Sequence, residues 1–430
     1  MSDTKEKSRK GPDLSIEVFG GVLDYDGAGL YPGLELLNLV FGSEEIELLP
    51  TVEVVRIRRK AHDFARRMVW DETFVNDASK SEVLFDEETE DTVSHLLSCL
   101  QLPIPNMVKA PGWDRAHFFP YTKSLIHWDA RLRAGGVRIE RRYFRGGGAL
   151  AFHILRKDPD QDRLQRCRNG FSALFSENEN SALERLSKTL LQHGFSDSEL
   201  GEDRLEARSK LKGDDHEELL REGIVNILEH TEVSGVTRIR SILTWVAFWL
   251  VLIQKSRSAA YLGRNSIAII CDCGARHVQL RRASQRCLKD TQTLIVDAIS
   301  KSSEGASISK QQLNKIRSFF WATAASINLL NAWKGRKHFT LGLNLLETFV
   351  LTSTSGATEI PFEVFVHKWL YEKCGLVVGR DAAESGGQLT SFDVSVFEDN
   401  ENQLALQMKA AGLLAEYSDA TRMIGTGGLL

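Results

Sequence analysis

The hydrophobic pattern of the chain predicts helices more often than strands, and it changes character near residue 237. From there to residue 262 the sequence is apolar on all sides, and its centre, at 241–254, is the most hydrophobic stretch. That centre is shorter than the roughly 20 residues with which a helix spans a bilayer. We therefore predict a helix over 237–262 that is buried in a protein core. The apolar run at 266–274 predicts a buried strand.

Helical spacing of apolar residues predicts further helices on both sides of this segment. Ser309, followed three residues later by Gln312, forms a capping box that starts one of them at residue 310. The stretch 137–155 differs, because its alternation and its Gly-rich centre predict two strands around a turn. The expected helices cover 52–68, 92–100, 180–193, 215–230, 276–301, 310–333 and 340–353.

The C-terminal segment, 357–430, has a pattern of its own. Proline and glycine at its two ends predict a helix over 361–374. Apolar residues at helical spacing predict a second helix over 399–411, and the segment 413–424 then predicts a hairpin. Helix, glycine, strand, turn and strand is the order at the end of many winged-helix domains. We therefore predict a winged-helix-like module here.

These elements together predict an α-rich α+β protein. A chain of 430 residues is long enough for two or three domains. We expect a disordered tail at 1–13, a mixed α+β domain at 14–195, a linker or long loop at 196–215, a basic helical domain at 216–356 and the winged-helix-like module at 357–430.

The composition is that of a soluble globular protein, with 42% hydrophobic and 26% charged residues. The first 13 residues contain no apolar run, so we expect no secretory signal. Six scattered cysteines suit a reducing compartment. Cys271 and Cys273 have His277 nearby but no fourth ligand for a zinc site. We expect a cytoplasmic protein that uses no membrane, no metal and no cofactor.

Charge is distributed very unevenly along the chain. Between Glu232 and Thr340 there are 17 Lys and Arg against 5 Asp and Glu, a local charge of +12. The whole chain carries −4, so the remaining residues sum to −16. A basic helical segment between acidic flanks predicts a surface for a polyanion, most commonly nucleic acid. We expect these cations to form one continuous surface.

Within this segment, Arg282, Arg286 and Lys289 recur at i, i+4 and i+7, on one face of the expected helix 276–301. Like charges at this spacing repel by about 0.2–0.5 kcal/mol, so an anionic partner is expected, either phosphate or an acidic protein surface. A second cluster lies at 333–339, where aromatic residues stand among cations. The candidate nucleic-acid-binding residues are Arg276, Arg281, Arg282, Arg286, Lys289, Lys334, Arg336, Lys337, Gln403, Gln407 and Lys409.

Two alternatives stay open. Asp393 followed by Gln407 and Lys409 resembles the acid, amide and lysine of restriction-type nucleases, which bind metal and activate water. Those nucleases carry the last two residues on a strand, whereas the spacing here is helical. The other alternative is a structural scaffold whose basic domain docks on acidic proteins. Residues 361–430 carry 5 Lys and Arg against 10 Asp and Glu, which favours a protein partner for this module as much as nucleic acid.

A basic helical body with a winged-helix-like end loosely resembles uncharacterised components of prokaryotic anti-phage defence systems. The resemblance covers at most the C-terminal half of the chain, and it implies a subunit of a multi-protein assembly. We therefore expect a non-enzymatic protein without catalytic residues that binds nucleic acid, with DNA favoured over RNA. Its acidic parts are expected to contact partner proteins.

Overall fold

The fold is α-rich α+β, as the sequence predicts, with many helices and a few small sheets. Part of the expected tail and most of the helix expected at 92–100 lie outside the described residues, and α1 already begins at Gly11. The computed structural model describes residues 10–43, 48, 54–62, 92, 95–96, 99–100, 102, 117–133, 136–139, 141–193, 196–204, 208–303, 308–332, 336–356, 358–417 and 421–427.

Helix α10 (Gly235–Leu262) forms the centre of the molecule. Every residue from Ser241 to Lys255 is buried. By length and composition the helix could cross a membrane, but 83% of its most apolar window is buried inside the protein. The predicted core helix is therefore confirmed. The helices packed against it are α1 (Gly11–Phe19), α2 (Tyr31–Gly42), α6 (Gly147–Arg156), α9 (Asp215–Glu229), α11 (Val278–Ser302), α12 (Lys310–Ser326) and α13 (Leu343–Ser353).

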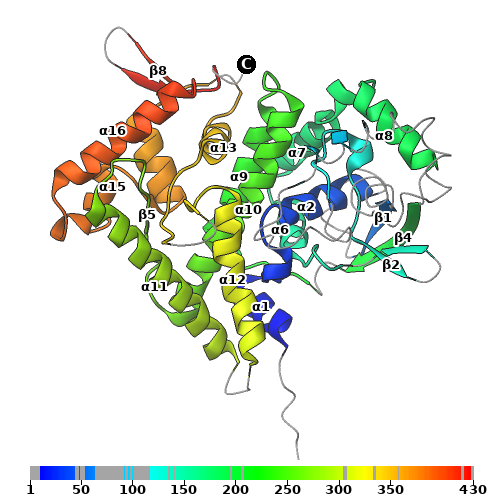
Figure 1. Ribbon diagram of the computed structural model, residues 1–430, viewed down its shortest axis with the longest axis horizontal. Helices are drawn as coiled ribbons and strands as arrows, with labels where there is room; N and C mark the ends of the chain where they lie inside the picture. Colours follow the sequence, from blue (N-terminus) through cyan, green and yellow to red (C-terminus); the bar gives the residue numbers. More distant parts are fainter. Residues whose placement is uncertain are drawn as a thin grey trace, which may run out of the picture.

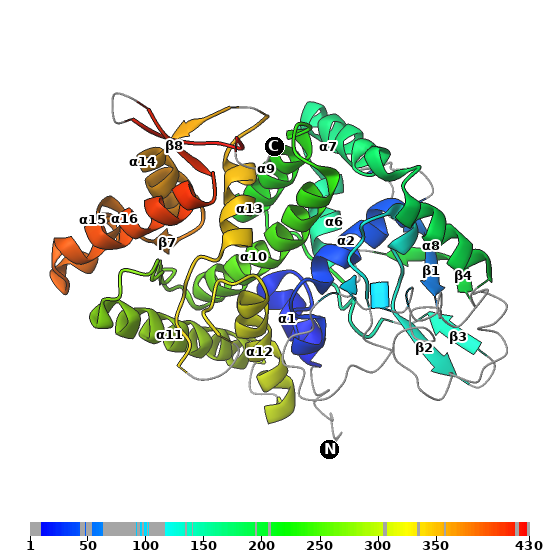
Figure 2. The same ribbon diagram turned by 45° about the horizontal axis from the view of Figure 1, so that its top comes forward.

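Two groups of elements lie on opposite sides of α10 (Figures 1 and 2). One side holds α2, α6, α7 (Gln161–Ala173), α8 (Ala182–His193) and the antiparallel pair β1 (Val54–His62) and β4 (Ser196–Arg204). The other side holds α11 and the C-terminal elements. One hydrophobic core runs through both, from Leu14 to Ile424. The helices predicted at 180–193, 215–230, 276–301, 310–333 and 340–353 are confirmed as α8, α9, α11, α12 and α13, although α12 ends earlier, at Ser326.

Two predictions for the first half of the chain are wrong. Residues 54–62, expected in a helix, form β1, and residues 196–204, expected in a linker or long loop, are its partner β4. Ile57 and Arg59 are buried while Arg56, Arg58 and Lys60 are exposed, so the strand alternates between two faces.

The second strand expected within 137–155 is also wrong. Only its first part is extended, as β3 (Gly136–Ile139), which pairs with β2 (Ala130–Arg133). The Gly-rich centre opens α6 instead, because Gly148 has no side chain to keep α6 away from α2. Backbone N–H groups of Gly146 and Gly148 donate to the Glu35 carboxylate at 3.1 and 2.9 Å, which caps the start of α6 from the neighbouring helix.

The C-terminal elements follow the predicted order. The expected helix at 361–374 is present as α14 (Phe362–Val364) and the π-helical segment η7 (Phe365–Lys373). Helix α16 (Val394–Ala410) begins earlier than predicted, because the Asp393 carboxylate accepts from the Ser395 N–H at 2.9 Å. The predicted hairpin is β8 (Leu414–Glu416) and β9 (Arg422–Ile424), and β6 (Ile360–Pro361) adds a third strand. The likeness to a winged helix stays a prediction.

A charged residue, Lys255, lies in the most buried part of α10. Its ammonium donates to the Ile267 carbonyl at 2.7 Å, and no described carboxylate forms an ion pair with it. Burial lowers the pKa of Lys255 to about 8, partly opposed by the nearby thiols of Cys287, Cys271 and Cys374. The protein therefore holds a lysine that is still mostly charged at neutral pH but loses its proton at a lower pH than a lysine in water.

We expect the wild type to gain stability relative to Lys255→Met as the pH rises. An unfolded lysine has a pKa of about 10.4, so between about pH 8 and pH 10 the unfolded chain binds more protons than the folded one. Stability then rises with pH, by about 2 kcal/mol between about pH 7.5 and pH 9.5. Urea unfolding of both proteins at each pH measures this difference. Lys310→Met, at an exposed lysine, is the control. Parallel pH dependences for wild type and Lys255→Met would contradict the prediction.

Candidate nucleic-acid interface

The start of α11 is fixed by two short parallel strands, β5 (Ile269–Ile270) and β7 (Leu376–Val377). Asn400 of α16 is fully buried where both strands end. Its side-chain oxygen accepts from the Cys273 N–H at 2.8 Å, and its amide donates to the carbonyls of Cys271 and Val378 at 2.9 Å each. One side chain thus joins the two strand ends and the loop that leads into α11.

Asp272 holds the next part of this loop. Its carboxylate accepts from the Gly274 N–H at 2.9 Å and from Arg281 Nε at 2.7 Å, and His338 Nε2 lies 3.5 Å away. Burial alone would raise the pKa of Asp272, but His338, Arg281 and the Gly274 amide hold it well below its usual value. Asp272 therefore stays charged, and Arg281, a candidate contact residue, has an acidic partner inside the protein.

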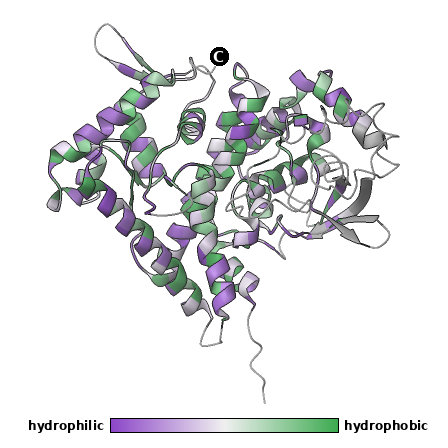
Figure 3. Cartoon of the chain, in the orientation of Figure 1, coloured by the Kyte–Doolittle hydropathy of each residue, from purple (hydrophilic) through white to green (hydrophobic). Residues whose placement is uncertain are grey.

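Three cations of α11 form what we call the basic face: Arg282, Arg286 and Lys289. All three are exposed, and none of their side chains has a hydrogen bond or ion pair with any described residue. The opposite side of α11 is buried through residues such as Leu280 and Ile295. Hydrophilic and hydrophobic residues accordingly alternate along this helix (Figure 3). The sequence predicted these three cations on one face of a helix, and the structure confirms that placement.

Two further candidate cations lie beside the start of α11. Arg276 precedes the helix in a left-handed conformation, with φ of 61°, and is exposed. Arg336 is exposed in the loop that is tied to α11 by the bond from the Phe339 N–H to Ser284 Oγ, at 2.7 Å. The first turn of α11 has neither a side-chain cap nor an acidic residue, so its N–H groups add positive potential there.

Of the other candidates of the 333–339 cluster, Lys337 does not add to this surface. Lys334 lies outside the described residues. Lys337 Nζ lies 3.6 Å from the centre of the Trp321 ring, and burial lowers its pKa. Within the described part of this cluster, Arg336 is the exposed cation.

Two of the three candidate residues on α16, Gln407 and Lys409, already bond to other residues of the chain. The Gln407 amide donates to the Cys273 carbonyl at 2.9 Å, and the Lys409 ammonium pairs with Glu416. Gln403 is half-buried. Asp393 caps the opposite end of the helix from Lys409, about 24 Å away at 1.5 Å per residue. The nuclease arrangement, which requires a strand and converging side chains, is therefore not formed by these residues.

The expectation of one continuous basic surface over 232–340 is wrong. Several of these cations hold the protein together through acids that are far away in sequence. Arg238 pairs with Glu177, Arg240 with Glu347, Arg257 with Asp214 and Glu217, and Lys315 with Asp26. The charge excess therefore divides into internal ion pairs and the smaller exposed basic face.

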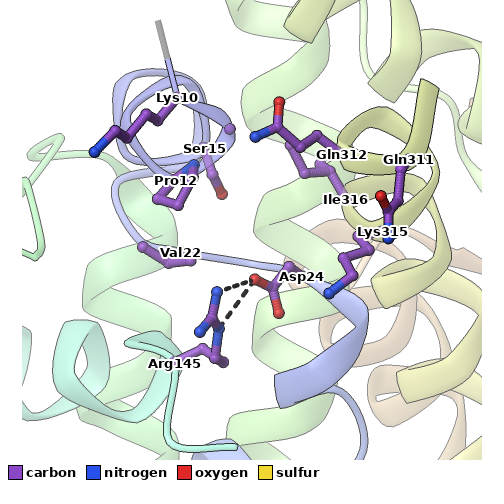
Figure 4. A pocket seen from close by; sticks show the side chains of 11 residues that line it. Lys10, Pro12, Ser15, Val22, Asp24, Arg145, Gln311, Gln312, Lys315 and Ile316 are labelled. Atoms are coloured by element: carbon purple, nitrogen blue, oxygen red, sulfur yellow. Dashed lines mark hydrogen bonds and ion pairs between the residues drawn. The ribbon is translucent and has the colours of Figure 1, made fainter. Parts of the chain in front are cut away.

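A pocket of about 470 Å³ lies between α1 and α12 (Figure 4). Arg145 bonds to the Asp24 carboxylate at 3.0 Å through Nε and 2.8 Å through Nη2. The cations that line this pocket are Lys10, Arg145 and Lys315. Arg145 and Lys315 both have acidic partners. Its walls include Pro12, Val22 and Ile316. We do not take it as a phosphate site, since its positive charge is largely neutralised.

Among the described residues, no group of three or more His, Cys, Asp or Glu side chains could hold a metal ion. Comparisons with protein-family models, with curated proteins and with solved structures find no match to this chain. The basic face must therefore be interpreted from its own chemistry.

Proposed function

We propose that this protein binds nucleic acid through the basic face of α11, without catalysing a reaction. The observation that carries the proposal is the exposure of Arg282, Arg286 and Lys289 on one helix face with no acidic partner among the described residues. Such spacing costs stability through repulsion, and a phosphate backbone would remove that cost.

The size of the basic face suits a nucleic-acid backbone. Arg282 and Lys289 are seven residues apart on a helix, about 10 Å, which is enough for two or three phosphates. Arg276, Arg336 and the uncapped first turn of α11 extend the positive potential. The major groove of duplex DNA admits an α-helix, whereas that of RNA is deep and narrow. These points favour DNA over RNA.

We further propose that the acidic parts of the chain contact protein partners, as in a cytoplasmic, multi-protein assembly of the anti-phage type. Residues 361–430 carry five more acids than bases. On α15 (Arg380–Ser385) the exposed residues Asp381 and Glu384 have no ion pair with any described residue. An acidic surface there would repel phosphates, which suits protein contacts better than base recognition.

Changing Arg282, Arg286 and Lys289 together to alanine should weaken duplex DNA binding by roughly tenfold or more, because two or three phosphate contacts are lost. Filter binding at one fixed salt concentration measures the loss. The control variant, Lys368→Ala with Lys373→Ala and Arg380→Ala, removes three exposed cations that are each paired with an acid. It should bind nearly as the wild type does.

Equal losses in the two triple variants would mean that binding follows net charge rather than the basic face. No DNA or RNA binding by the wild type, together with α11-dependent binding to an acidic protein, would favour the scaffold alternative. Far-ultraviolet circular dichroism of each variant checks that the fold is kept.

A further inference from the structure

A second basic site lies far from α11, on the other side of α10. It is a cleft of about 810 Å³ between β1, the turn η4 (Lys123–Leu125) and α8. Figures 1 and 2 both place β1 and α8 on the side of the molecule away from α11. Its volume falls within the range of small-molecule sites, about 300–1,000 Å³.

Three cations in this cleft have no acidic partner among the described residues. Arg58 and Lys60 are two residues apart on β1 and project from the same exposed face, and Lys123 is exposed on η4. None of the three side chains has a hydrogen bond or an ion pair with the described part of the chain. Their charges come from two separate elements and meet at one cleft.

The acids of the cleft do not neutralise these cations. Burial alone would raise the pKa of Glu184, but hydrogen bonds from Ser124 and the nearby Lys188 lower it, so Glu184 is charged. Ser124 Oγ donates to it at 2.6 Å, and Lys188 Nζ lies 3.4 Å away. Glu184 and Lys188 therefore offset each other. Glu179 is exposed at the cleft, which still leaves the lining with a positive balance.

One wall of the same cleft is apolar. Phe41 and Phe175 pack edge to face with ring centres 5.0 Å apart, and Ile126 lies beside them. Lys123 Nζ lies 5.8 Å from the centre of the Phe41 ring, at the border between the apolar wall and the cations. Amide side chains of Asn178 and Asn180 also line the site. An apolar wall, amides and several unpaired cations suit a ligand with a flat organic part and a polyanionic part.

We propose that this cleft binds a free nucleotide that carries two or three phosphates. Arg58, Lys60 and Lys123 would bind the phosphates, because arginine and lysine are the side chains that hold phosphate oxygens through charge-assisted hydrogen bonds. The phenylalanine wall and the asparagines would contact the base and sugar. This proposal stands apart from the basic face of α11.

Titration calorimetry with ATP as the probe tests the proposal. The wild type should bind ATP, and Arg58→Ala with Lys60→Ala, and separately Lys123→Ala, should each raise the Kd at least about tenfold. These changes lie at exposed positions, and Arg58 and Lys60 stand opposite uncharged residues of β4, Leu200 and Ser198, so the strand pair should survive. Lys368→Ala with Lys373→Ala is the control and should bind ATP as the wild type does.

Three results would overturn the proposal: no ATP binding to the wild type at millimolar concentration, equal affinity in wild type and cleft variants, or equal loss in the control. Adenosine should bind at least about tenfold more weakly than ATP, because it lacks phosphates; equal binding would contradict the assignment. A 5′-phosphorylated oligonucleotide that binds the cleft when ATP does not would also overturn it. The α11 triple variant should keep ATP binding, and the cleft variants should keep duplex binding, so the two proposals fail separately.

Discussion

Gly148→Ala should lower the free energy of unfolding by about 3 kcal/mol or more. A Cβ added at Gly148 would lie 2.5 Å from Glu35 Cβ and 2.6 Å from the Leu36 nitrogen, and still closer to the Pro32 carbonyl oxygen. Two of these are backbone atoms of α2, which cannot rotate away as a side chain end can. To relieve the overlap, α6 must move off α2. That movement would also break the bonds from Gly146 and Gly148 to the buried Glu35 carboxylate.

Urea unfolding of Gly148→Ala measures this loss. Gly427→Ala is the matched control, since the same added methyl meets nothing within 4 Å there. The control should stay within about 0.5 kcal/mol of the wild type. A Gly148→Ala protein as stable as the control would show that α2 and α6 do not approach as closely as described.

The second large effect is expected at Asn400. Asn400→Ala leaves the Cys273 N–H and the carbonyls of Cys271 and Val378 without their partner in a buried site. Each unsatisfied buried group costs about 1–3 kcal/mol, so we expect a loss of about 3–5 kcal/mol after relaxation. The loop into α11 should loosen as well, because the same side chain holds it to β7.

Gln403→Ala on the same helix is the control, because Gln403 is half-buried and its side chain makes no hydrogen bond to the described residues. Denaturant unfolding gives the stability of both variants, and amide hydrogen exchange over 271–282 reports on the loop and the start of α11. If Asn400→Ala and Gln403→Ala are equally stable, with equal exchange, Asn400 does not join the strand ends.

Helices were predictable from the sequence where signals within the helix itself are enough to specify it. The apolar spacing of α10 and α12 and the cap at Ser309 are local signals, and the Ser309 Oγ does accept from the Gln312 N–H. Strand β1 was not predictable in the same way. Its partner β4 is far along the chain, and the sequence of β4 has the polar composition of a loop. The two segments become strands only because they pair with each other.

The placement of the basic face on one side of a helix was predictable for a similar reason. Arg282, Arg286 and Lys289 repel one another along one helix, and that needs no knowledge of distant residues. The partners of Arg238, Arg240 and Arg257 come from distant segments, so the sequence could not show that these cations are paired. The unpaired Arg58 and Lys60 were missed because residues 52–68 were interpreted as a helix. The alternation of Arg56, Arg58 and Lys60 with Val55 and Ile57 is the signal that could have revealed them.

The salt dependence of DNA binding tests the central claim most directly. Each phosphate neutralised on a duplex lowers log K by about 0.9 per unit of log salt concentration. Filter binding of the wild type and of the Arg282, Arg286 and Lys289 triple alanine variant at several salt concentrations gives the two slopes. The account predicts a slope that is shallower by roughly 2–3 units in the variant. The same slope in both proteins would contradict it, because the basic face of α11 would then contact no phosphate.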